Sequence, residues 1–408
     1  MDIMRGFGVY RRGLAVCLAA LLVLSLAGPL AGCSAQQPQI AAEASSLSSG
    51  STASTDQRQE SVTPAQEPVT VTFCAVGDNL IHGSVYRNYA NGDGTYDFTG
   101  AYEHTAEYIQ SVDVAYINQE TVCGGSELGL SDYPVFNSPH EVITAVADAG
   151  FDWISTSSNH AYDYGEEGII SQLDFIEADG RLIQTGTNDS WEAAAEPRVL
   201  EVKGVRFGLA SYTYGLNGFE LPAGQEYLVN LIDRDRIAED VALLNEVSDV
   251  QIVSMHWGVE YVYEPTAEQV ELAYFLSDLG VDVIIGSHPH VVEPTTFITG
   301  DNGQRTLVIY SLGNFLSAQD EPERMLGEMT RWSVTYDFAS GEATVGDVEI
   351  WPTVNHLRPG WVGHSTYLLK DYDDSLAAGH MLAGSGLSRQ YLISLAEDVF
   401  GDEFPIIY

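Results

Sequence analysis

The fold is decided by two neighbouring segments, QIVSMHWGVEY (251–261) and GVDVIIGSHPHVV (280–292). Runs rich in β-branched residues at 251–254 and 281–285 are typical of buried strands. Between them, apolar and small side chains recur at helical spacing over residues 266–279, and a glycine follows. A strand, a helix and a second strand within about 40 residues form a βαβ unit, which requires parallel strands. The stretch therefore predicts an α/β fold.

Three histidines follow these predicted strands. His256 comes after the first, and His288 and His290 come after the second. Because the carboxyl ends of parallel strands meet at one edge of a sheet, we expect the three imidazoles where open α/β sheets bind ligands. Neutral imidazole is the commonest side-chain metal ligand, and Pro289 stiffens the backbone between two of them. A lone histidine would more often be a structural hydrogen-bonding residue, but three at adjacent strand ends favour a metal site.

Three earlier segments repeat this arrangement of a strand followed by polar residues. The expected strands are 69–76, 113–117 and 151–155, with helices expected at 100–110, 140–149 and 166–178. The polar residues that follow the strands are Asp78, Asn118, Glu120, Asn159 and His160. Carboxylate oxygens and imidazole nitrogens at five strand ends suit Mn²⁺, Zn²⁺ or Fe²⁺ in a site of one or two metals. Taken singly, Asp78 would usually be a turn residue and Asn159 a helix cap.

The first 33 residues have the features of a secretory signal. A basic start precedes an apolar run that is too short for a stable membrane span, and small residues follow. The ending Leu-Ala-Gly-Cys resembles the bacterial lipobox, which implies cleavage before Cys33 and a lipid on its thiol. The alternative is a chance cysteine after an ordinary signal peptide. We expect a protein anchored by lipid to the cell membrane, on its extracytoplasmic face.

The rest of the sequence, from residue 34 onward, divides into segments of different composition. Residues 34–68 are rich in Ser, Ala, Gln and Thr and cannot bury enough apolar surface to fold, so they predict a disordered tether. Residues 69–340 are expected to form the main domain. A strand at 344–351 and one or two helices within 376–400 belong to a C-terminal extension, residues 341–408, that completes the domain. A disulfide between Cys74 and Cys123 is left open, although Cys74 fits a small buried apolar residue better.

The charge balance excludes some partners. The chain has a net charge of −41, and removal of residues 1–33, which hold three arginines and one aspartate, would bring it to −43. Such a charge argues against nucleic acid and anionic membrane surfaces as partners. It also repels polyanionic substrates unless metal ions reverse the sign locally.

The polar segments occur in an order that resembles a known family. They are Gly77-Asp78, Asn118-Gln119-Glu120, SNHAYDYG (158–165), HWGVEY (256–261), GSHPHV (286–291) and YSLGNF (310–315). Residues 71–318 resemble the bacterial CapA-type capsule or poly-γ-glutamate synthesis proteins of the calcineurin-like metallophosphatase superfamily. The resemblance implies a four-layer α-β-β-α sandwich with a two-metal site at strand ends.

The resemblance also implies roles for individual residues. Asp78 matches a metal-bridging aspartate, and His160 matches the histidine that protonates a leaving oxygen. The other implied metal ligands are Glu120, Asn159, His256, His288 and His290. Two cations about 3.5–4 Å apart would lower the pKa of a shared water and stabilise charge on a phosphoryl group.

Two positions depart from the superfamily pattern. Leu80 stands where the first motif has a histidine, and Glu120 stands where the second motif has an aspartate. Either His82 replaces the missing ligand or it only supports the site. Further residues are expected either to support the site or to serve as ligands: Asn118, Asp163, Glu260 and Asn314.

Three functions follow as alternatives. The first is a CapA-type protein in the synthesis, export or retention of an anionic polymer such as poly-γ-glutamate, with the polymer or its synthase and export complex as partners. The second is an extracytoplasmic metal-dependent phosphoesterase, which His160 favours. The third is a non-catalytic scaffold subunit, which Leu80 favours.

Overall fold

The structure is a computed structural model, and it describes residues 67–408. The predicted signal peptide, the predicted lipidation site Cys33 and the predicted tether up to residue 66 lie outside the described residues. Within residues 67–408, no helix is both long and apolar enough to cross a membrane.

The first of two sheets contains eight strands in the order β14-β13-β12-β1-β2-β3-β4, with β11 beside the end of β1. Strands β1 to β4 run parallel, whereas β12, β13 and β14 are antiparallel to their neighbours. The bounds are β1 Val69–Asn79, β2 Val114–Gln119, β3 Trp153–Ser155, β4 Ile183–Thr185, β11 Asn314–Leu316, β12 Leu326–Asp337, β13 Glu342–Arg358 and β14 Val362–Leu368.

The second sheet contains six strands in the order β5-β6-β7-β8-β10-β9. Their bounds are β5 Arg198–Val202, β6 Val205–Thr213, β7 Val250–His256, β8 Val283–Ser287, β9 Thr295–Thr299 and β10 Arg305–Ile309. Strands β7 and β8 are parallel, as the βαβ unit predicted. Helix α8 (Ala267–Asp278) connects them, and it begins with a capping box in which Thr266 and Gln269 bond each other's backbone.

Alternating side chains along β1 show how the layers form. Phe73 and Ala75 point into a core between the two sheets, whereas Cys74 and Val76 point into a core beneath the helices of the first sheet. This is the two-residue period of a strand buried on both faces. A third core lies between the second sheet and helices α7 (Arg234–Val247) and α8.

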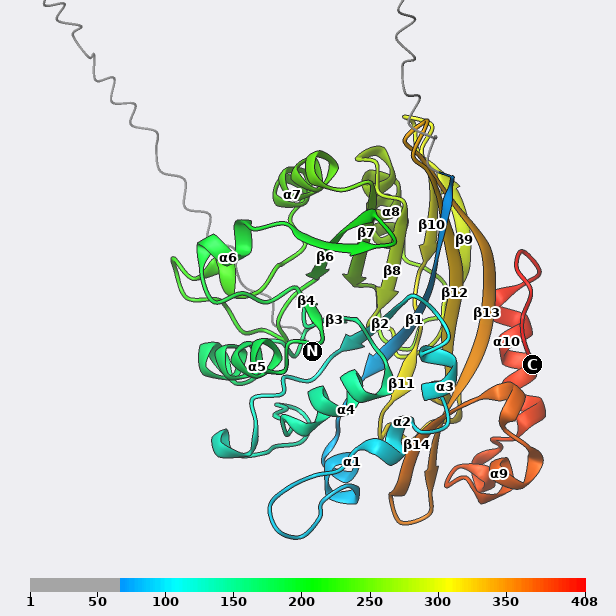
Figure 1. Cartoon of the computed structure of the whole chain (residues 1–408). Coiled ribbons are helices and arrows are strands. Elements are labelled where there is room, and N and C mark those ends of the chain that lie inside the picture. The colour runs from blue at the N-terminus through cyan, green and yellow to red at the C-terminus, as the bar shows by residue number, and fades with distance from the viewer. Residues whose placement is uncertain (1–66) are drawn as a thin grey trace, which may run out of the picture. The chain divides into compact units, whose positions relative to one another are not determined.

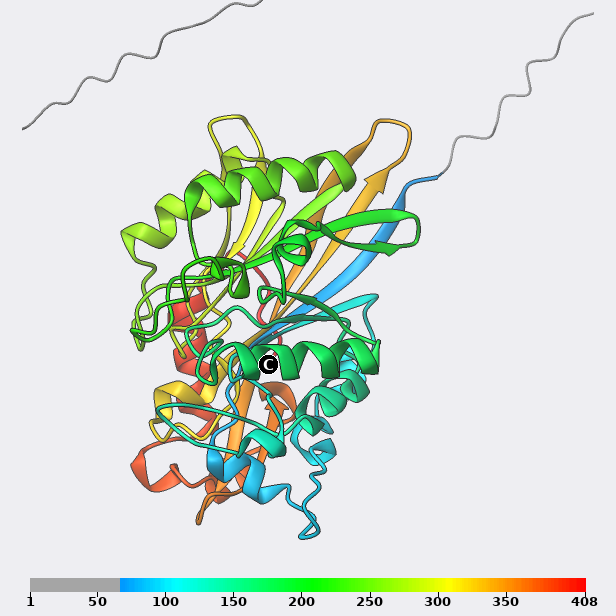
Figure 2. The ribbon, with the colours of Figure 1, turned by 90° about the vertical axis from the view of Figure 1, so that its left-hand side faces the viewer.

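The predicted four-layer α-β-β-α arrangement is therefore confirmed (Figures 1 and 2). The helices on the first sheet are α1 Gly83–Asn88, α2 Thr99–Tyr102, α3 Ala106–Ile109, α4 Glu141–Ala149 and α5 Gly165–Asp179. A short helix, α6 Trp191–Ala195, precedes β5.

The prediction of a single helix over residues 100–110 was wrong, because the chain forms two short helices there, α2 and α3. Thr105 lies between them, and both its N–H and its hydroxyl donate to the carbonyl of Tyr102, at 2.9 and 3.0 Å. A threonine side chain that bonds the backbone in this way competes with the helical pattern.

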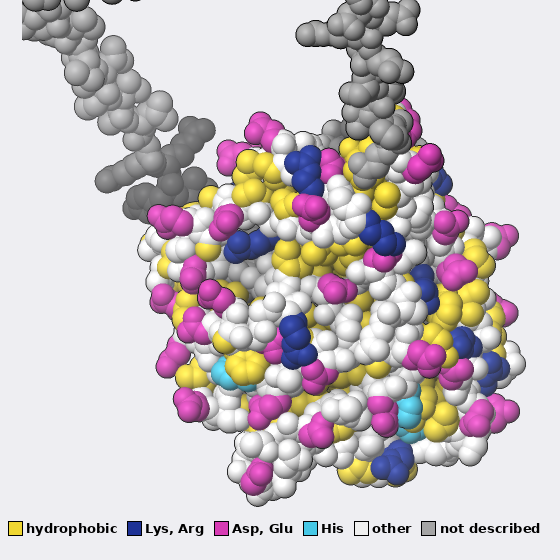
Figure 3. All heavy atoms as spheres, in the orientation of Figure 1, with side chains coloured by type: hydrophobic (Ala, Val, Ile, Leu, Met, Phe, Trp, Pro, Cys, Tyr) yellow, Lys and Arg dark blue, Asp and Glu magenta, His cyan; other side chains and the backbone are white. Residues whose placement is uncertain are grey.

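The C-terminal residues continue the first sheet. Strands β13 and β14 extend it beyond β12, and helices α9 (Asp374–Gly379) and α10 (Arg389–Phe400) share a core with β13. Cys74 and Cys123 are both buried free thiols. The surface in Figure 3 carries many more Asp and Glu than Lys and Arg side chains.

Candidate metal centre

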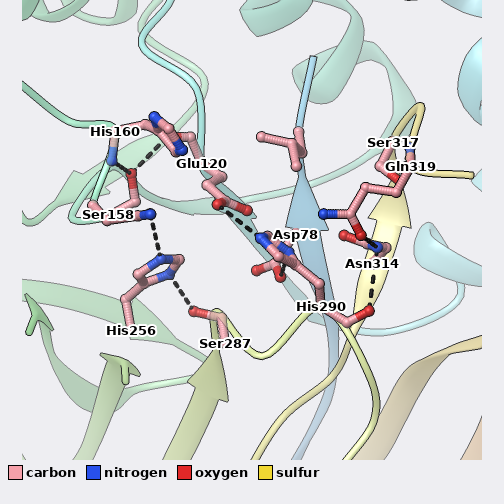
Figure 4. A network of polar contacts seen from close by, with 12 residues as sticks. Asp78, Glu120, Ser158, His160, His256, Ser287, His290, Asn314, Ser317 and Gln319 are labelled. Carbon is pink, nitrogen blue, oxygen red and sulfur yellow. Dashed lines mark hydrogen bonds and ion pairs between the residues drawn. The ribbon is translucent and has the colours of Figure 1, made fainter. Parts of the chain in front are cut away.

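The predicted site residues lie at the carboxyl ends of strands from both sheets (Figure 4). Asp78 lies near the end of β1, Glu120 follows β2, and His256 ends β7. The remaining four residues follow β3 and β8, and they are Asn159, His160, His288 and His290. All seven are buried. The structure thus brings them together, while their roles as ligands or as catalyst stay predictions.

Asp78, Glu120 and His290 form one group that could hold a cation, with ligand atoms all within 4.8 Å of one another. His290 lies between the carboxylates: its Nδ1 is 3.0 Å from Asp78 Oδ2, and its Nε2 is 3.5 Å from Glu120 Oε1. Burial lowers the pKa of His290, but Glu120 and Asp78 outweigh burial and raise it to about 9. The concentration of negative charge that causes this shift also attracts a divalent cation.

A second group of three residues also has ligand atoms within 4.8 Å of one another. It consists of Glu120, His256 and His288. His256 is held from both sides, because its Nδ1 is 3.0 Å from Ser287 Oγ and its Nε2 is 2.9 Å from Asn159 Oδ1. Burial lowers the pKa of both imidazoles, helped by neighbouring histidines, and brings that of His288 to about 3. Both are therefore neutral near pH 7, which is the form that binds metals.

Glu120 belongs to both groups, so two candidate cation positions share one carboxylate. Both of its oxygens are buried without a hydrogen-bond partner among residues 67–408, as are His288 Nδ1 and Asn118 Oδ1. Burial raises the pKa of Glu120 well above its usual range. Each unsatisfied buried polar group costs on the order of 1–3 kcal/mol. A cation would satisfy several of them together, so these residues fit a divalent metal such as Mn²⁺, Zn²⁺ or Fe²⁺.

The backbone around the two later histidines adopts an uncommon conformation. His288 has φ 101° and His290 has φ 59°, in the region that favours glycine. The loop is fixed from outside, because the N–H of Tyr261 donates to the carbonyl of Pro289 at 2.7 Å. Gly77 is needed near Asp78, since a Cβ there would overlap the carbonyl oxygen of Gly313. Such strain is characteristic of functional sites.

His160 lies beside these groups and contacts a different set of residues. Its Nδ1 is 2.7 Å from Asp163 Oδ2, and its ring packs edge-on against Phe136 at 4.7 Å between centroids. Asp163 Oδ2 also accepts the N–H of Phe136 at 2.7 Å. Asp163 therefore fixes the orientation of His160 through Nδ1, which leaves Nε2, 3.4 Å from the amide nitrogen of Asn217, as the nitrogen for proton transfer.

His82 belongs to none of the three candidate metal-binding groups found among the described residues. Its Nδ1 is 3.1 Å from the N–H of Ala318, and burial lowers its pKa to about 4. It lines a hollow of about 660 Å³ together with Arg87, Asp132 and Trp361. Leu80 is buried, at 3% exposure.

The other predicted supporting residues all lie at the site. Asn118 donates to Asp78 Oδ1 at 2.9 Å. Asn314 pairs with Asp78 in the β1–β11 register, and its amide donates to the carbonyl of His290 at 3.2 Å. Glu260, which is exposed, forms a third group with His288 and His290. Trp257 is only 1% exposed and donates to the carbonyl of Tyr310, so it packs inside the domain.

Sequence reasoning missed Asn217 and Ser287. Asn217 contacts Asn159 at 3.1 Å and lies 3.3 Å from His160 Nδ1, yet it belongs to a loop after β6 that follows no recognised motif. Its only signal is the Asn217-Gly218 pair, which is typical of an ordinary turn. Ser287 adjoins His288 in sequence, so its position beside His256 follows once β7 and β8 are paired.

Residues 72–319 match the model of the family described as bacterial capsule synthesis protein PGA_cap. The PGA biosynthesis protein CapA of Bacillus subtilis (strain 168) is 31% identical over 189 residues, which are 44% of this chain and 46% of that protein. The capsule biosynthesis protein CapA of Bacillus anthracis is 27% identical over 274 residues, which are 64% of this chain and 64% of that protein. The matches thus span less than two thirds of either relative.

Similar solved structures include two nucleotidases. The NAD nucleotidase of Haemophilus influenzae has a TM-score of 0.44 and 11% identity, and covers 84% of this chain and 58% of its own. The 5′-nucleotidase precursor of Thermus thermophilus has a TM-score of 0.42 and 14% identity, and covers 81% of this chain and 59% of its own.

Proposed function

This chain belongs to the bacterial capsule synthesis protein family PGA_cap, and from that premise we propose that it acts in the synthesis, export or retention of an anionic capsule polymer of the poly-γ-glutamate type. The named relatives, a PGA biosynthesis protein and a capsule biosynthesis protein, support this role. The proposal places the protein on the extracytoplasmic face of the cell membrane, held by a lipid on Cys33. Its partners are then the polymer or the complex that makes and exports it.

The proposed role is exerted through a metal-dependent hydrolase-type site. The observation that carries this step is the buried carboxylate of Glu120, which makes no hydrogen bond among the described residues, has only the 3.5 Å ion pair with His290, and belongs to two ligand groups at once. Asp78 and His290 would complete one cation position, and His256 and His288 the other. Bound divalent cations supply an acidified water and stabilise developing negative charge.

The protein's own residues would bind and move protons around that centre. Asp163 holds His160 with its Nδ1 proton directed at the carboxylate, so that a second proton at Nε2 can pass to a leaving group. Asn159 orients His256 through its side-chain oxygen at 2.9 Å. Buried surroundings exclude bulk water and strengthen these electrostatic contacts.

Elemental analysis of the full chain, purified in detergent without chelators or a His-tag, tests the metal centre. We expect two equivalents of Mn, Zn or Fe in the wild type and a marked loss in Glu120→Gln, which preserves shape but removes the shared charge. Glu342→Gln, an exposed carboxylate of β13, is the matched control. No metal in the wild type, even after addition of Mn²⁺, would leave only a scaffold role.

The polymer role is tested in the source bacterium. We expect Glu120→Gln in the chromosomal copy to reduce the cell-associated γ-glutamyl polymer, measured after acid hydrolysis, while Glu342→Gln leaves it unchanged. Unaltered polymer in the Glu120→Gln strain would contradict a catalytic part in its synthesis, export or retention.

A metal-dependent phosphoesterase of other substrates is the second candidate function. It is favoured by the pair of His160 and Asp163, since a purely structural metal site needs no oriented proton donor. A screen of phosphoesters with the metal-loaded chain separates the two candidates.

A further inference from the structure

Arg324 is a cation without an acidic partner among the described residues. It belongs to the short turn Pro322–Met325 between β11 and β12, and its Nε is buried without a hydrogen-bond partner in that part of the chain. Within residues 67–408 it also forms no ion pair with an Asp or Glu side chain. Arg305, Arg331, Arg358 and Arg389 of the described residues form no ion pair either, so what distinguishes Arg324 is its place beside the candidate metal centre. Other cations, such as Lys203 and Arg206, do pair with aspartates.

Arg324 is stacked on an aromatic ring beside the candidate metal centre. Its guanidinium carbon lies 3.7 Å from the ring centroid of Tyr261, and that ring lies 6.0 Å from the ring of His290. Tyr261 is 38% exposed, so the stack lies at the surface next to a buried predicted ligand. A guanidinium that stacks through its face keeps its N–H edges free, and because Nε of Arg324 is buried, the edge left for a planar oxyanion is that of its two terminal nitrogens.

Two loops fix this stack relative to the centre. The N–H of Tyr261 donates to the carbonyl of Pro289 at 2.7 Å, between His288 and His290. On the other side, the amide nitrogen of Asn314 lies 3.2 Å from His290 O and 2.9 Å from Gln319 Oε1 (Figure 4). The same nitrogen lies 3.2 Å from the backbone oxygen of Arg324. The backbones of Tyr261 and Arg324 are therefore both held close to the backbone around His290.

Acidic side chains lie near this stack, but none forms an ion pair with Arg324 among the described residues. Glu260 precedes Tyr261, and its carboxylate has an oxygen within 4.8 Å of ligand atoms of His288 and His290. Glu323 adjoins Arg324 in the sequence. A guanidinium without an ion-pair partner on a strongly acidic surface attracts an external anion that the rest of that surface repels.

We propose that Arg324 and Tyr261 form an oxyanion-binding subsite beside the candidate metal centre. It takes a second anionic group of the substrate, a carboxylate or a phosphoryl group, while another part of the substrate faces the centre. The inference rests on the proposed function and deepens it: in a γ-glutamyl polymer, each residue would offer such a carboxylate. Arginine binds either group through two parallel N–H···O bonds.

Calorimetric titration of the full chain in detergent with a γ-linked glutamate pentamer tests the subsite, with glycerol phosphate as a second probe. We expect Arg324→Gln to weaken pentamer binding about tenfold or more, because a charge-assisted pair is lost, and Arg324→Lys to weaken it less. Arg305→Gln is the control: Arg305 is stacked in the same way, 3.3 Å from the ring centroid of Phe297, but on β10. It should bind like the wild type.

The outcomes separate this inference from the proposed function when metal content and unfolding temperature are measured on the same samples. Unchanged pentamer and glycerol phosphate binding in a folded, metal-loaded Arg324→Gln variant would overturn the subsite and leave the proposed function intact. Equal loss in Arg305→Gln would also overturn it, because only general charge would then matter. Weakened binding of glycerol phosphate alone would retain the subsite and assign its ligand as phosphoryl. A wild type that holds no metal but binds the pentamer through Arg324 would retain the subsite and overturn the metal-dependent function.

Discussion

His160 differs from the other site histidines in that its Nδ1 contacts a carboxylate outside the candidate metal-binding groups, Asp163, at 2.7 Å. We therefore expect His160→Ala to reduce metal-dependent hydrolysis about 100-fold or more, as loss of a general acid does. Because His160 is not among the grouped ligands, the metal content should not change. Turnover with the best phosphoester or γ-glutamyl substrate, and elemental analysis of the same sample, measure both quantities.

Asp163→Asn provides the companion measurement. It keeps the volume of the side chain and removes the charge that orients the imidazole, so the turnover should fall less than in His160→Ala while its pH profile shifts. A loss of metal in His160→Ala would show instead that His160 is itself a ligand.

Glu328 provides a pH-dependent prediction away from the candidate ligands. It is fully buried in β12 and accepts hydrogen bonds from Thr295 and Thr330. Burial raises the pKa of Glu328 from 4.5 to about 8, although the two hydrogen bonds act to lower this pKa. Between these values the unfolded chain loses a proton that the folded chain keeps. The stability contributed by the protonated carboxyl is therefore complete below about pH 4.5 and is lost as the pH rises to about 8.

Glu328→Gln should remove this dependence, because the amide is neutral at every pH and keeps an acceptor oxygen. We expect the unfolding temperature of the variant to exceed that of the wild type by a few degrees at pH 8, on the order of 2 °C per kcal/mol, and to equal it at pH 4. Glu342→Gln, which is exposed, should show no such difference. If the unfolding temperatures of Glu328→Gln and the wild type differed by the same amount at every pH, the assigned pKa of Glu328 would be contradicted.

At the scale of elements, α10 tests whether the C-terminal residues are integral to the domain. Leu392 is fully buried in the core that α10 shares with β13. Leu392→Ala should lower the free energy of unfolding by about 2–5 kcal/mol, through lost burial and the cavity that remains. Ser394→Ala, an exposed position of the same helix, should be nearly neutral. Denaturant unfolding measures both, and two separate transitions in the wild type would show that this region folds independently.

Elements with a strong local signal could be predicted, and those that depend on distant contacts could not. The runs of β-branched residues and the helical spacing over residues 266–279 are local, so β7, α8 and β8 were expected within a few residues of their observed bounds. The break between α2 and α3 depends on a threonine hydroxyl that bonds the backbone, which residue spacing does not reveal. The same applies to Asn217, whose loop reaches the site only after β6 is placed beside β7.

At the scale of the whole molecule, the candidate centre joins the two sheets. Asp78 and Glu120 come from the first sheet, and His256, His288 and His290 come from the second, with mainly apolar side chains between the sheets elsewhere. The strand ends predicted that these side chains gather at the edge of a sheet, and the family resemblance implied that the site lies in a sandwich of two sheets. The stacking of Arg324 on Tyr261 could not be predicted, because nothing in the sequences of their two loops indicates that the loops meet.

A cation that binds residues of both sheets should stabilise the folded chain by linkage, because the unfolded chain cannot assemble the ligands. At a metal concentration 100 times the Kd, the gain is about 2.7 kcal/mol. We therefore expect Mn²⁺ to raise the unfolding temperature of the chelator-treated protein by several degrees in one cooperative transition, followed by calorimetry. Glu120→Gln should show a much smaller increase, whereas Glu342→Gln should respond like the wild type. An equal increase in Glu120→Gln would mean that Mn²⁺ binds elsewhere on the acidic surface, and that the two sheets are held together by their apolar core alone.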